Sequence, residues 1–276
     1  EDVREFIFDR ICSVLEQGNI EYLKWDMNRS LADVYSARSV QGKVTYDYMV
    51  GLYDFLEKLT AKYPDLLIEG CSGGGGRFDA GMLYYTPQIW CSDNTDAVDR
   101  LRIQYGTSFL YPISAVGSHV SAVPNHQTGR MTSLHTRGVV AMAGTFGYEL
   151  DPGKLTDREK EEVKEQVARF KGYADLVREG DYYRLSDPFR DSCGAWMFVS
   201  RDGAKALVNV VMLEVHGNMP VTYVRLKGLK PEAVYEDAES RRRYSGAALM
   251  NAGLPMPLRM GEYPAYQMEL NEVRLS

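Results

Sequence analysis

The first 180 residues alternate between short apolar runs and longer stretches with helical periodicity, and this alternation limits the folds open to the chain. Apolar runs predict strands at residues 20–26, 66–69, 88–92, 113–120 and 145–150. Helical spacing of apolar residues predicts helices at 3–15, 46–63, 97–109, 131–142 and 157–179. Strands that alternate with helices form βαβ units and a parallel sheet. Polar residues and glycines gather just after the strands, where α/β folds place their active sites.

The pattern changes after about residue 180. Shorter β-rich runs appear at residues 195–199, 205–211, 221–226, 233–236 and 266–270, with turn signals between them. Short strands divided by turns at close intervals are typical of an antiparallel β-sandwich. We therefore predict two domains, an α/β domain over residues 1–180 and a β-sandwich domain over residues 181–276.

The composition indicates a folded protein with a large core and an acidic surface. Of the 276 residues, 45% are hydrophobic, and the formal net charge is −6. The acidic balance argues against nucleic acid or an anionic membrane as a partner, because both require a basic surface. No apolar run reaches the ~18 residues that suggest a membrane span. The four cysteines form no CxxC pair and no zinc-type cluster with histidine, which favours reduced thiols in a cytoplasmic protein.

The chain opens with Glu1 in a helical pattern and has no initiator methionine. We therefore expect it to be an excised part of a longer protein.

Polar residues alternate along the end of the first predicted strand, where Lys24, Asp26 and Asn28 lie two apart. Side chains of a strand point alternately to its two faces, so these three share one side if the extended conformation continues. Burying a lysine and an aspartate together is costly unless they pair or serve a site. The spacing alone leaves two interpretations open, a structural Lys24–Asp26 salt bridge and a functional site.

Four consecutive glycines, Gly73 to Gly76, follow the second predicted strand and Cys71. Such a run allows the backbone to approach a ligand closely. No Gly-Lys-Ser/Thr sequence follows it, which argues against a phosphate-binding P-loop. A flexible linker is the other interpretation, and the position of the run inside a βα unit argues against it.

The third predicted strand, which includes Trp90, leads to Asp93. Thr95 is a candidate cap for the following helix. Asp96 and Asp99 lie in the first turns of that helix, where its dipole favours negative charge. These two acids have a structural explanation, which leaves Asp93 as the better candidate for chemistry.

Two carboxylates at the ends of different strands suit glycoside hydrolysis. One attacks the anomeric carbon of the sugar, and the other protonates the leaving oxygen. A serine hydrolase of the nucleophile-elbow type is disfavoured because the chain has no GxSxG motif. His119 and His126 lack the spacing of metal ligands on a helix, and we interpret them as loop residues that form hydrogen bonds rather than as catalytic groups.

Four stretches resemble the microbial α-galactosidases of glycoside hydrolase family 36, in the same order along the chain. They are KWDMNR at 24–29, CSGGGGRFD at 71–79, WCSDNTD at 90–96 and GSHVSAVPNHQ at 117–127. The resemblance implies that Asp26 is the nucleophile and Asp93 the general acid/base. It also implies that the galactose pocket is lined by Lys24, Asn28, Cys71 and Gly74, and we add Trp90 to the substrate-binding residues.

The resemblance also implies a fold. Members of this family carry an N-terminal β-domain and a complete (β/α)8 barrel, and the five strands predicted here match barrel strands four to eight. The expected fold class is therefore α/β, with a partial (β/α)8 TIM barrel over residues 1–180 and an antiparallel β-sandwich over residues 181–276.

The reaction that the resemblance implies is hydrolysis of terminal non-reducing α-galactosides such as melibiose or raffinose, with retention of configuration. No metal or organic cofactor is expected. The partner is a small-molecule α-galactoside, and the intact enzyme is expected to be a homo-oligomer. Two other functions stay open: a truncated chain that only binds or assembles, and a transglycosylating relative.

Overall fold

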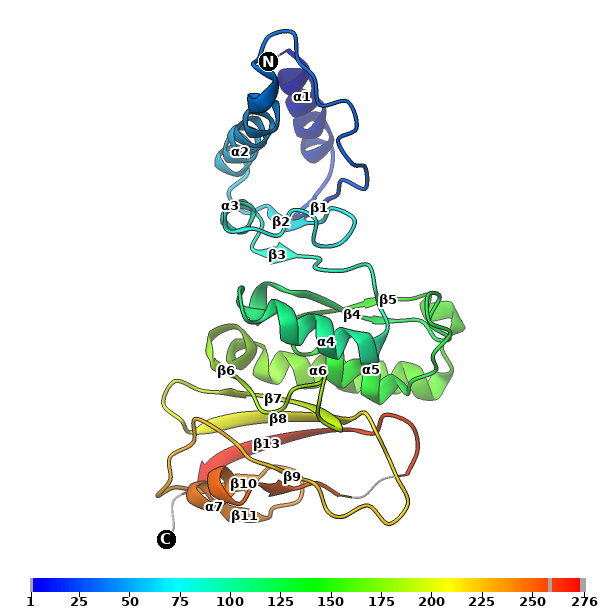
Figure 1. Ribbon diagram of the computed structural model, residues 1–276, viewed down its shortest axis with the longest axis vertical. Helices are drawn as coiled ribbons and strands as arrows, with labels where there is room; N and C mark the ends of the chain where they lie inside the picture. The colour runs from blue at the N-terminus through cyan, green and yellow to red at the C-terminus, as the bar shows by residue number, and fades with distance from the viewer. Residues whose placement is uncertain (1, 258–259, 274–276) are drawn as a thin grey trace. The chain divides into compact units, whose positions relative to one another are not determined.

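The computed structural model describes residues 2–257 and 260–273 and divides into two compact units (Figure 1). The first unit is Glu1–Asp93 and the second is Asn94–Ser276. Each unit is described separately below. The predicted domain boundary at residue 180 lies inside the second unit and stays a prediction.

A three-stranded parallel sheet in the order β1-β2-β3 organises the first unit. Its strands are β1 Tyr22–Trp25, β2 Leu67–Gly70 and β3 Gln88–Ile89. The helical elements are α1 Asp2–Glu16, η1 Gln41–Lys43, α2 Val44–Lys62 and α3 Ala80–Tyr85. The parallel pairing predicted from the alternation of strands and helices is confirmed in this unit, although β3 is shorter than the predicted strand at 88–92 and α3 was not predicted.

The core of the first unit lies between its helices and the sheet. Leu56 and Leu59 of α2 and Ile68 of β2 are fully buried, and they belong to one cluster of apolar side chains. The ring of Phe8 on α1 packs edge-on against that of Phe55 on α2, with 5.6 Å between the ring centroids. These contacts use one side of α1 and fix both helices against each other.

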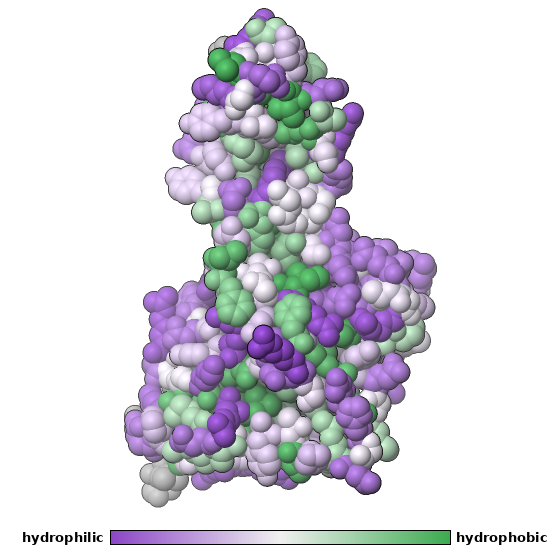
Figure 2. Space-filling view, viewed as in Figure 1, coloured by the Kyte–Doolittle hydropathy of each residue, from purple (hydrophilic) through white to green (hydrophobic). Residues whose placement is uncertain are grey.

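Other apolar side chains of α1 are exposed. Val3, Phe6, Ile7 and Val14 all lie on the surface, and Figure 2 shows hydrophobic residues at the surface in this part of the first unit. An exposed apolar patch of this kind is typical of a surface that contacts another protein segment. The apolar periodicity therefore predicted α1 correctly, but it did not predict that several of its apolar side chains are exposed.

The first part of the second unit contains a parallel pair of strands, β4 Gly117–Ser121 and β5 Thr145–Glu149. Its helical elements are α4 Ala97–Thr107, η2 Ile113–Ala115, α5 Leu134–Ala141, η3 Pro152–Lys154 and α6 Asp157–Glu179. The strand predicted at 113–120 is thus partly wrong, because its first residues form a 3-10 turn in which Ala115 N donates to Pro112 O at 3.0 Å.

The bounds of α6 agree with the predicted helix at 157–179, and its start has a clear cause. Thr156 and Glu159 form a capping box, in which the side chain of each accepts a hydrogen bond from the backbone N–H of the other. Two N–H groups at the helix start that lack helical partners are satisfied in this way.

A six-stranded antiparallel sheet in the order β11-β10-β13-β8-β7-β6 forms the rest of the second unit. Its strands are β6 Asp181–Arg184, β7 Cys193–Val199, β8 Lys205–Met212, β10 Val234–Asp237, β11 Arg243–Ser245 and β13 Ala265–Val273. Beside it lie the antiparallel pair β9 Tyr223–Val224 and β12 Leu254–Pro255, and the helix α7 Gly246–Asn251. The antiparallel sheet predicted for the C-terminal part is confirmed.

Both faces of this sheet are covered, so β7 is buried along its whole length. Ala195 and Met197 point into a core that also contains side chains of β9, α7 and β12. Trp196 points to the other face and lies beside Leu101 of α4 around a small cavity. Side chains on successive residues of a strand alternate between faces, which explains why the run from Cys193 to Val199 is apolar at almost every position.

No helix in the described ranges is long and apolar enough to cross a membrane.

Candidate active site

The predicted site residues of the first unit follow the carboxyl ends of its three parallel strands. Asp26 comes directly after β1, Cys71 directly after β2, and Trp90 directly after β3. Backbone hydrogen bonds continue past the strand ends, from Cys71 N to Trp25 O at 2.9 Å and from Trp90 N to Gly70 O at 2.8 Å. The three segments therefore stay in register, and their polar side chains reach one edge of the sheet.

Asn28 connects the predicted nucleophile to the glycine run. Its Nδ2 donates to Asp26 Oδ2 at 2.8 Å, and its Oδ1 accepts from Gly73 N at 3.0 Å. One amide side chain thus holds the Asp26 carboxylate and the loop after β2 in a fixed relation, without adding a charge.

The surroundings of Asp26 favour its ionised form. Burial raises the pKa of this carboxyl group, but hydrogen bonds from the Cys71 thiol, the Asn28 amide and the Met27 backbone lower it, as does the charge of Lys24. The lowering effects win, so the pKa of Asp26 lies below its usual value. A carboxylate that stays ionised and exposed at a strand end is suited to nucleophilic attack.

The Cys71 thiol is the neutral counterpart of this carboxylate. Cys71 is only 4% exposed, and burial together with the hydrogen bond to Asp26 raises the pKa of the thiol to about 11. At neutral pH the thiol is therefore protonated, and it donates a hydrogen bond to the Asp26 carboxylate.

The glycine run packs backbone against backbone on the segment that leads to Asp93. Gly74 has φ +79°, and a Cβ atom there would lie 2.8 Å from Ser92 Cα and 3.0 Å from Asp93 N. A Cβ atom on Gly75 would lie 2.7 Å from the carbonyl oxygen of Cys91. Glycine is required at both positions for the two loops to approach this closely, which argues against the linker interpretation.

Trp90 links Lys24 to Asp93. The Lys24 ammonium lies 5.2 Å from the centroid of the Trp90 ring, within the range of a cation–π interaction. The indole Nε1 donates to Asp93 Oδ1 at 3.0 Å. The first unit therefore brings together all seven residues predicted for the site: Lys24, Asp26, Asn28, Cys71, Gly74, Trp90 and Asp93.

Lys24 forms its ion pair with Glu69. The structural interpretation of the spacing had instead paired Lys24 with Asp26. Lys24 Nζ lies 3.4 Å from Glu69 Oε1, and the Glu69 side chain is almost fully buried. Reasoning from the sequence missed Glu69. The sequence did contain a signal, because Glu69 is an acidic residue at the end of an apolar strand. It lies two positions before Cys71, so the two side chains are on the same face of the strand.

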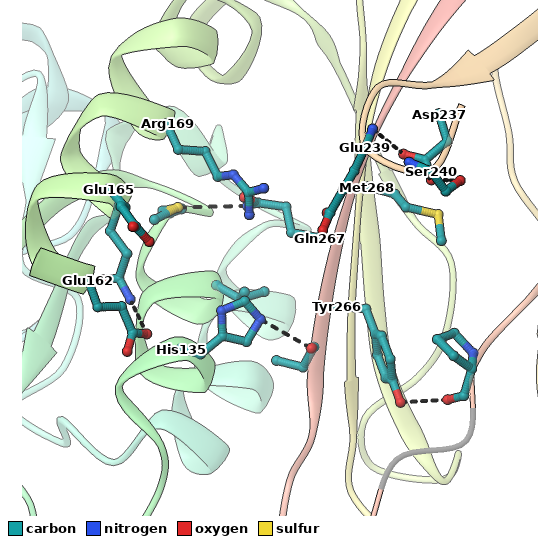
Figure 3. A pocket seen from close by; sticks show the side chains of 15 residues that line it. His135, Glu162, Glu165, Arg169, Asp237, Glu239, Ser240, Tyr266, Gln267 and Met268 are labelled. Carbon is teal, nitrogen blue, oxygen red and sulfur yellow. Dashed lines mark hydrogen bonds between the residues drawn. The ribbon is translucent and has the colours of Figure 1, made fainter. Parts of the chain in front are cut away.

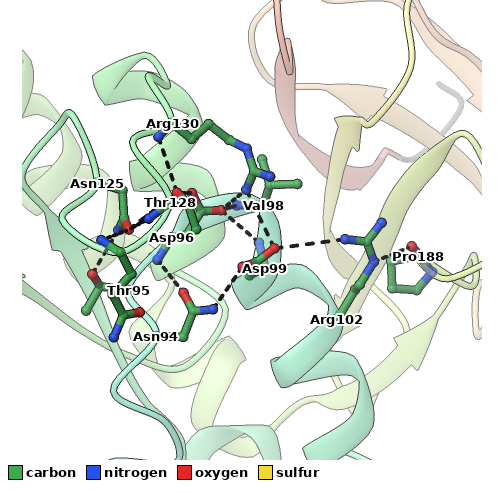
Figure 4. Close-up of polar contacts among 11 residues, drawn as sticks. Asn94, Thr95, Asp96, Val98, Asp99, Arg102, Asn125, Thr128, Arg130 and Pro188 are labelled. Atoms are coloured by element: carbon green, nitrogen blue, oxygen red, sulfur yellow. Dashed lines mark hydrogen bonds and ion pairs between the residues drawn. The ribbon is translucent and has the colours of Figure 1, made fainter.

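The contacts of the segment after Asp93 correct the predicted cap of helix α4 (Figure 4). Thr95 does not cap α4, and its Oγ1 accepts from Asn125 Nδ2 at 3.1 Å. The cap is Asp96, which accepts from two backbone N–H groups of the first turn and also from Thr128 Oγ1 at 2.7 Å. Asp96 is 2% exposed and forms an ion pair with Arg130. Its carboxylate is thus engaged in structural contacts, which supports Asp93 rather than Asp96 as the acid.

A cavity of about 600 Å³ in the second unit lies elsewhere, between α5, α6 and β13 (Figure 3). Acidic and basic side chains such as Glu162, Glu165 and Arg169 line it, and none of the seven predicted site residues does. His135 Nε2 lies 3.3 Å from the carbonyl oxygen of Ala265 at its wall. Among the described residues, no group of three or more His, Cys, Asp or Glu side chains is placed to hold a metal ion. The candidate site is therefore the sheet edge of the first unit.

Comparison with known families gives two matches that together span most of the chain. The Melibiase family matches residues 1–180, and the Glycosyl hydrolase family 36 C-terminal domain matches residues 194–270. The first match contains every residue of the candidate site.

Curated relatives are similar over nearly the whole chain. The bifunctional alpha-galactosidase/sucrose kinase AgaSK of Mediterraneibacter gnavus is 62% identical over 274 residues, which are 99% of this chain and 29% of the relative. Alpha-galactosidase AgaA of Geobacillus stearothermophilus is 50% identical and is matched over 99% of this chain and 38% of its own length. The chain thus spans 29% and 38% of the length of these two relatives.

Solved structures agree with the sequence matches. The crystal structure of AgaA from Geobacillus stearothermophilus superposes with a TM-score of 0.96 and 50% identity, over 99% of this chain and 38% of that one. A variant of the same enzyme, solved in complex with raffinose, also gives a TM-score of 0.96, with 49% identity over the same shares of the two chains.

Proposed function

This chain belongs to the melibiase family, and we propose that it supplies the nucleophile and the general acid/base of a retaining α-galactosidase. The substrates are galacto-oligosaccharides of the melibiose and raffinose type, from which terminal non-reducing α-D-galactose is removed. Relatives solved with raffinose and stachyose support this class of substrate. The observation that carries the proposal is the link between the two carboxylates: Asn28 holds the Asp26 carboxylate to the glycine run, and that run packs against the backbone of Asp93.

The reaction proceeds by two displacements. Asp26 attacks the anomeric carbon while Asp93 gives a proton to the departing glycosidic oxygen, which leaves galactose covalently bound to Asp26. Asp93, now a carboxylate, takes a proton from water, and that water releases galactose with the configuration it had in the substrate. This mechanism requires neither a metal nor an organic cofactor.

The remaining residues of the site bind and orient the sugar. Lys24 and Asn28 present an ammonium and an amide beside Asp26, and both are groups that hydrogen-bond sugar hydroxyls. Gly74 lines the pocket and lets the glycine run pack against the backbone of Asp93, and the Trp90 indole orients the acid/base through its hydrogen bond. Cys71 keeps the nucleophile ionised and completes the wall of the galactose pocket.

The architecture is part of the proposal. Strands β1 to β5 correspond to strands four to eight of a (β/α)8 barrel over residues 1–180, and residues 181–276 form a β-sandwich domain. The whole enzyme is longer than this chain, is cytoplasmic and forms homo-oligomers, with no nucleic acid or membrane as a partner. The lengths of the relatives support a longer enzyme chain, and the apolar surface of α1 supports a further protein contact.

The test uses the full-length enzyme. Asp26→Ala and Asp93→Ala are each expected to lower kcat by several orders of magnitude, whereas Asp65→Ala, in an exposed turn before β2, leaves it unchanged. Added azide restores turnover to Asp26→Ala, because the small anion fills the space of the nucleophile and attacks the anomeric carbon. Near-normal activity in either site variant would refute the assignment.

A second candidate function is binding or assembly without turnover. It is favoured by one observation: β1 is an edge strand, and its outer side has no partner strand among the described residues. Size-exclusion chromatography and a chromogenic α-galactoside assay of the 276-residue chain separate the two functions. Turnover by this chain at the rate of the full-length enzyme would refute the binding-only function. Product analysis at high sugar concentration distinguishes hydrolysis from transglycosylation.

A further inference from the structure

Glu69 is a buried carboxylate that the proposed mechanism does not use. It lies on β2, the central strand, and only 1% of its surface is exposed. In the sheet register it stands directly between Lys24 of β1 and Gln88 of β3. A buried carboxylate is strongly unfavourable unless neighbouring groups compensate its charge, so its partners indicate its role.

Those partners come from both flanking strands. Gln88 Nε2 donates to Glu69 Oε2 at 2.8 Å, and the hydroxyl group of Tyr22 donates to the same oxygen. Gln88 Nε2 also lies 3.1 Å from the Tyr22 hydroxyl oxygen. Lys24 Nζ, 3.4 Å from Oε1, supplies the opposite charge. Three residues from two strands therefore hold Glu69 in one orientation, with one carboxylate oxygen toward Lys24.

Lys24 needs such a neighbour to occupy a defined position. Its side chain is 37% exposed, and its ammonium group ends a flexible four-carbon stem. Glu69 stands on one side of the ammonium group, and the ring of Trp90 lies 5.2 Å away. From this position the ammonium charge acts on the Asp26 carboxylate.

We propose that Glu69 is a positioning residue, which holds the Lys24 ammonium group beside Trp90 and Asp26. This inference rests on the proposed glycosidase function and extends it to a residue that does not touch the sugar. Glu69 acts on the reaction only through Lys24, so the effect of removing its charge depends on whether Lys24 is present.

A double-mutant cycle in the full-length enzyme tests this dependence. Glu69→Gln keeps the shape and removes the charge, and it is expected to lower kcat/KM by about 100-fold, the loss typical of a misplaced site group. In the Lys24→Met background the same change is expected to have less than about a twofold effect, because the group that Glu69 positions is gone. Equal losses in both backgrounds would overturn the inference.

Two further variants keep the result interpretable. Glu16→Gln is the matched control. Glu16 also forms an ion pair with a lysine, 2.9 Å from Lys62 Nζ, but this pair lies on the surface. The kcat/KM of the Glu16→Gln variant is expected to be unchanged. Tyr22→Phe replaces Glu69→Gln in the cycle if the latter fails to unfold cooperatively. It removes one hydrogen bond to Glu69 and is expected to cost about fivefold alone and nothing measurable with Lys24→Met. Equal losses from Tyr22→Phe would again contradict the role of Glu69.

The outcomes also separate this inference from the proposed function. Absence of α-galactoside turnover in the wild-type full-length enzyme would refute the function. Wild-type turnover with additive losses would refute only the positioning role. If Glu69 merely stabilises the sheet, thermal unfolding shifts while kcat/KM per folded molecule stays the same, which would also overturn the inference.

Discussion

Replacing Gly74 with alanine tests the contact between the glycine run and the segment that carries Asp93. The new Cβ atom would lie 2.8 Å from Ser92 Cα, so the two loops must separate by at least about 0.6 Å to reach ordinary van der Waals contact at 3.4 Å. The residue also keeps φ +79°, which costs an L-residue about 1–2 kcal/mol. With the overpacking cost, the loss of unfolding free energy is expected to be about 2–5 kcal/mol.

The displacement acts on catalysis through Asp93. A shift of this size in a reacting group is expected to lower kcat by about 10- to 100-fold. The loss should be larger for melibiose than for an aryl galactoside with a good leaving group, because the latter needs little help from a general acid. The assay compares kcat for both substrates with thermal unfolding of the same full-length variant.

Gly73→Ala is the matched control for this prediction. Gly73 also has positive φ, +53°, but a Cβ atom at this position would meet no other group within 4 Å. Alanine at this position therefore carries the backbone strain without the collision. Equal losses of kcat in the two variants would refute the reasoning, since strain alone would then explain both.

Three other expectations follow from the structure. The Cys71 thiol and the Lys24 charge both lower the pKa of Asp26, so Cys71→Ala or Lys24→Met should raise that pKa. The acidic limb of the pH–rate profile should then move to higher pH, which kinetics from about pH 3 to 7, in steps of roughly half a unit, would check. With a thiol pKa of about 11, native Cys71 should react slowly with iodoacetamide at pH 8 and fast only after unfolding, as peptide mass spectrometry would show. Tyr235→Phe removes a buried 2.7 Å hydrogen bond to the Gly203 carbonyl and should lower the unfolding free energy by about 1–3 kcal/mol, measured by chemical denaturation.

Strand-end positions were predictable from the sequence because two local signals agreed. Apolar runs lead directly into Asp26 and Cys71 at the ends of β1 and β2, and parallel sheets bring such ends to one edge, whereas Asp93 lies beyond the end of β3 at Ile89. Helix α6 was predictable to the residue because its capping box and the following Gly180 mark both ends.

Features that depend on contacts between distant segments were not predictable. The pairing of Lys24 with Glu69 is fixed by the register of β1 against β2, which no local pattern specifies. Asp96 rather than Thr95 caps α4, and the Thr95 hydroxyl group instead accepts from Asn125, thirty residues later. Both cases involve contacts between segments that lie far apart in the sequence, which no local pattern specifies.

The central claim is that Asp26 forms the covalent bond to galactose, and direct trapping of that bond tests it. The full-length enzyme is treated with a fluorinated, activated α-galactoside whose glycosyl–enzyme forms but hydrolyses slowly, and the digested protein is analysed by mass spectrometry. We predict a single added fluorogalactosyl mass on the peptide that contains Asp26, located on Asp26. Labelling of Asp93 or of another carboxylate, or inactivation without any covalent adduct, would contradict the account.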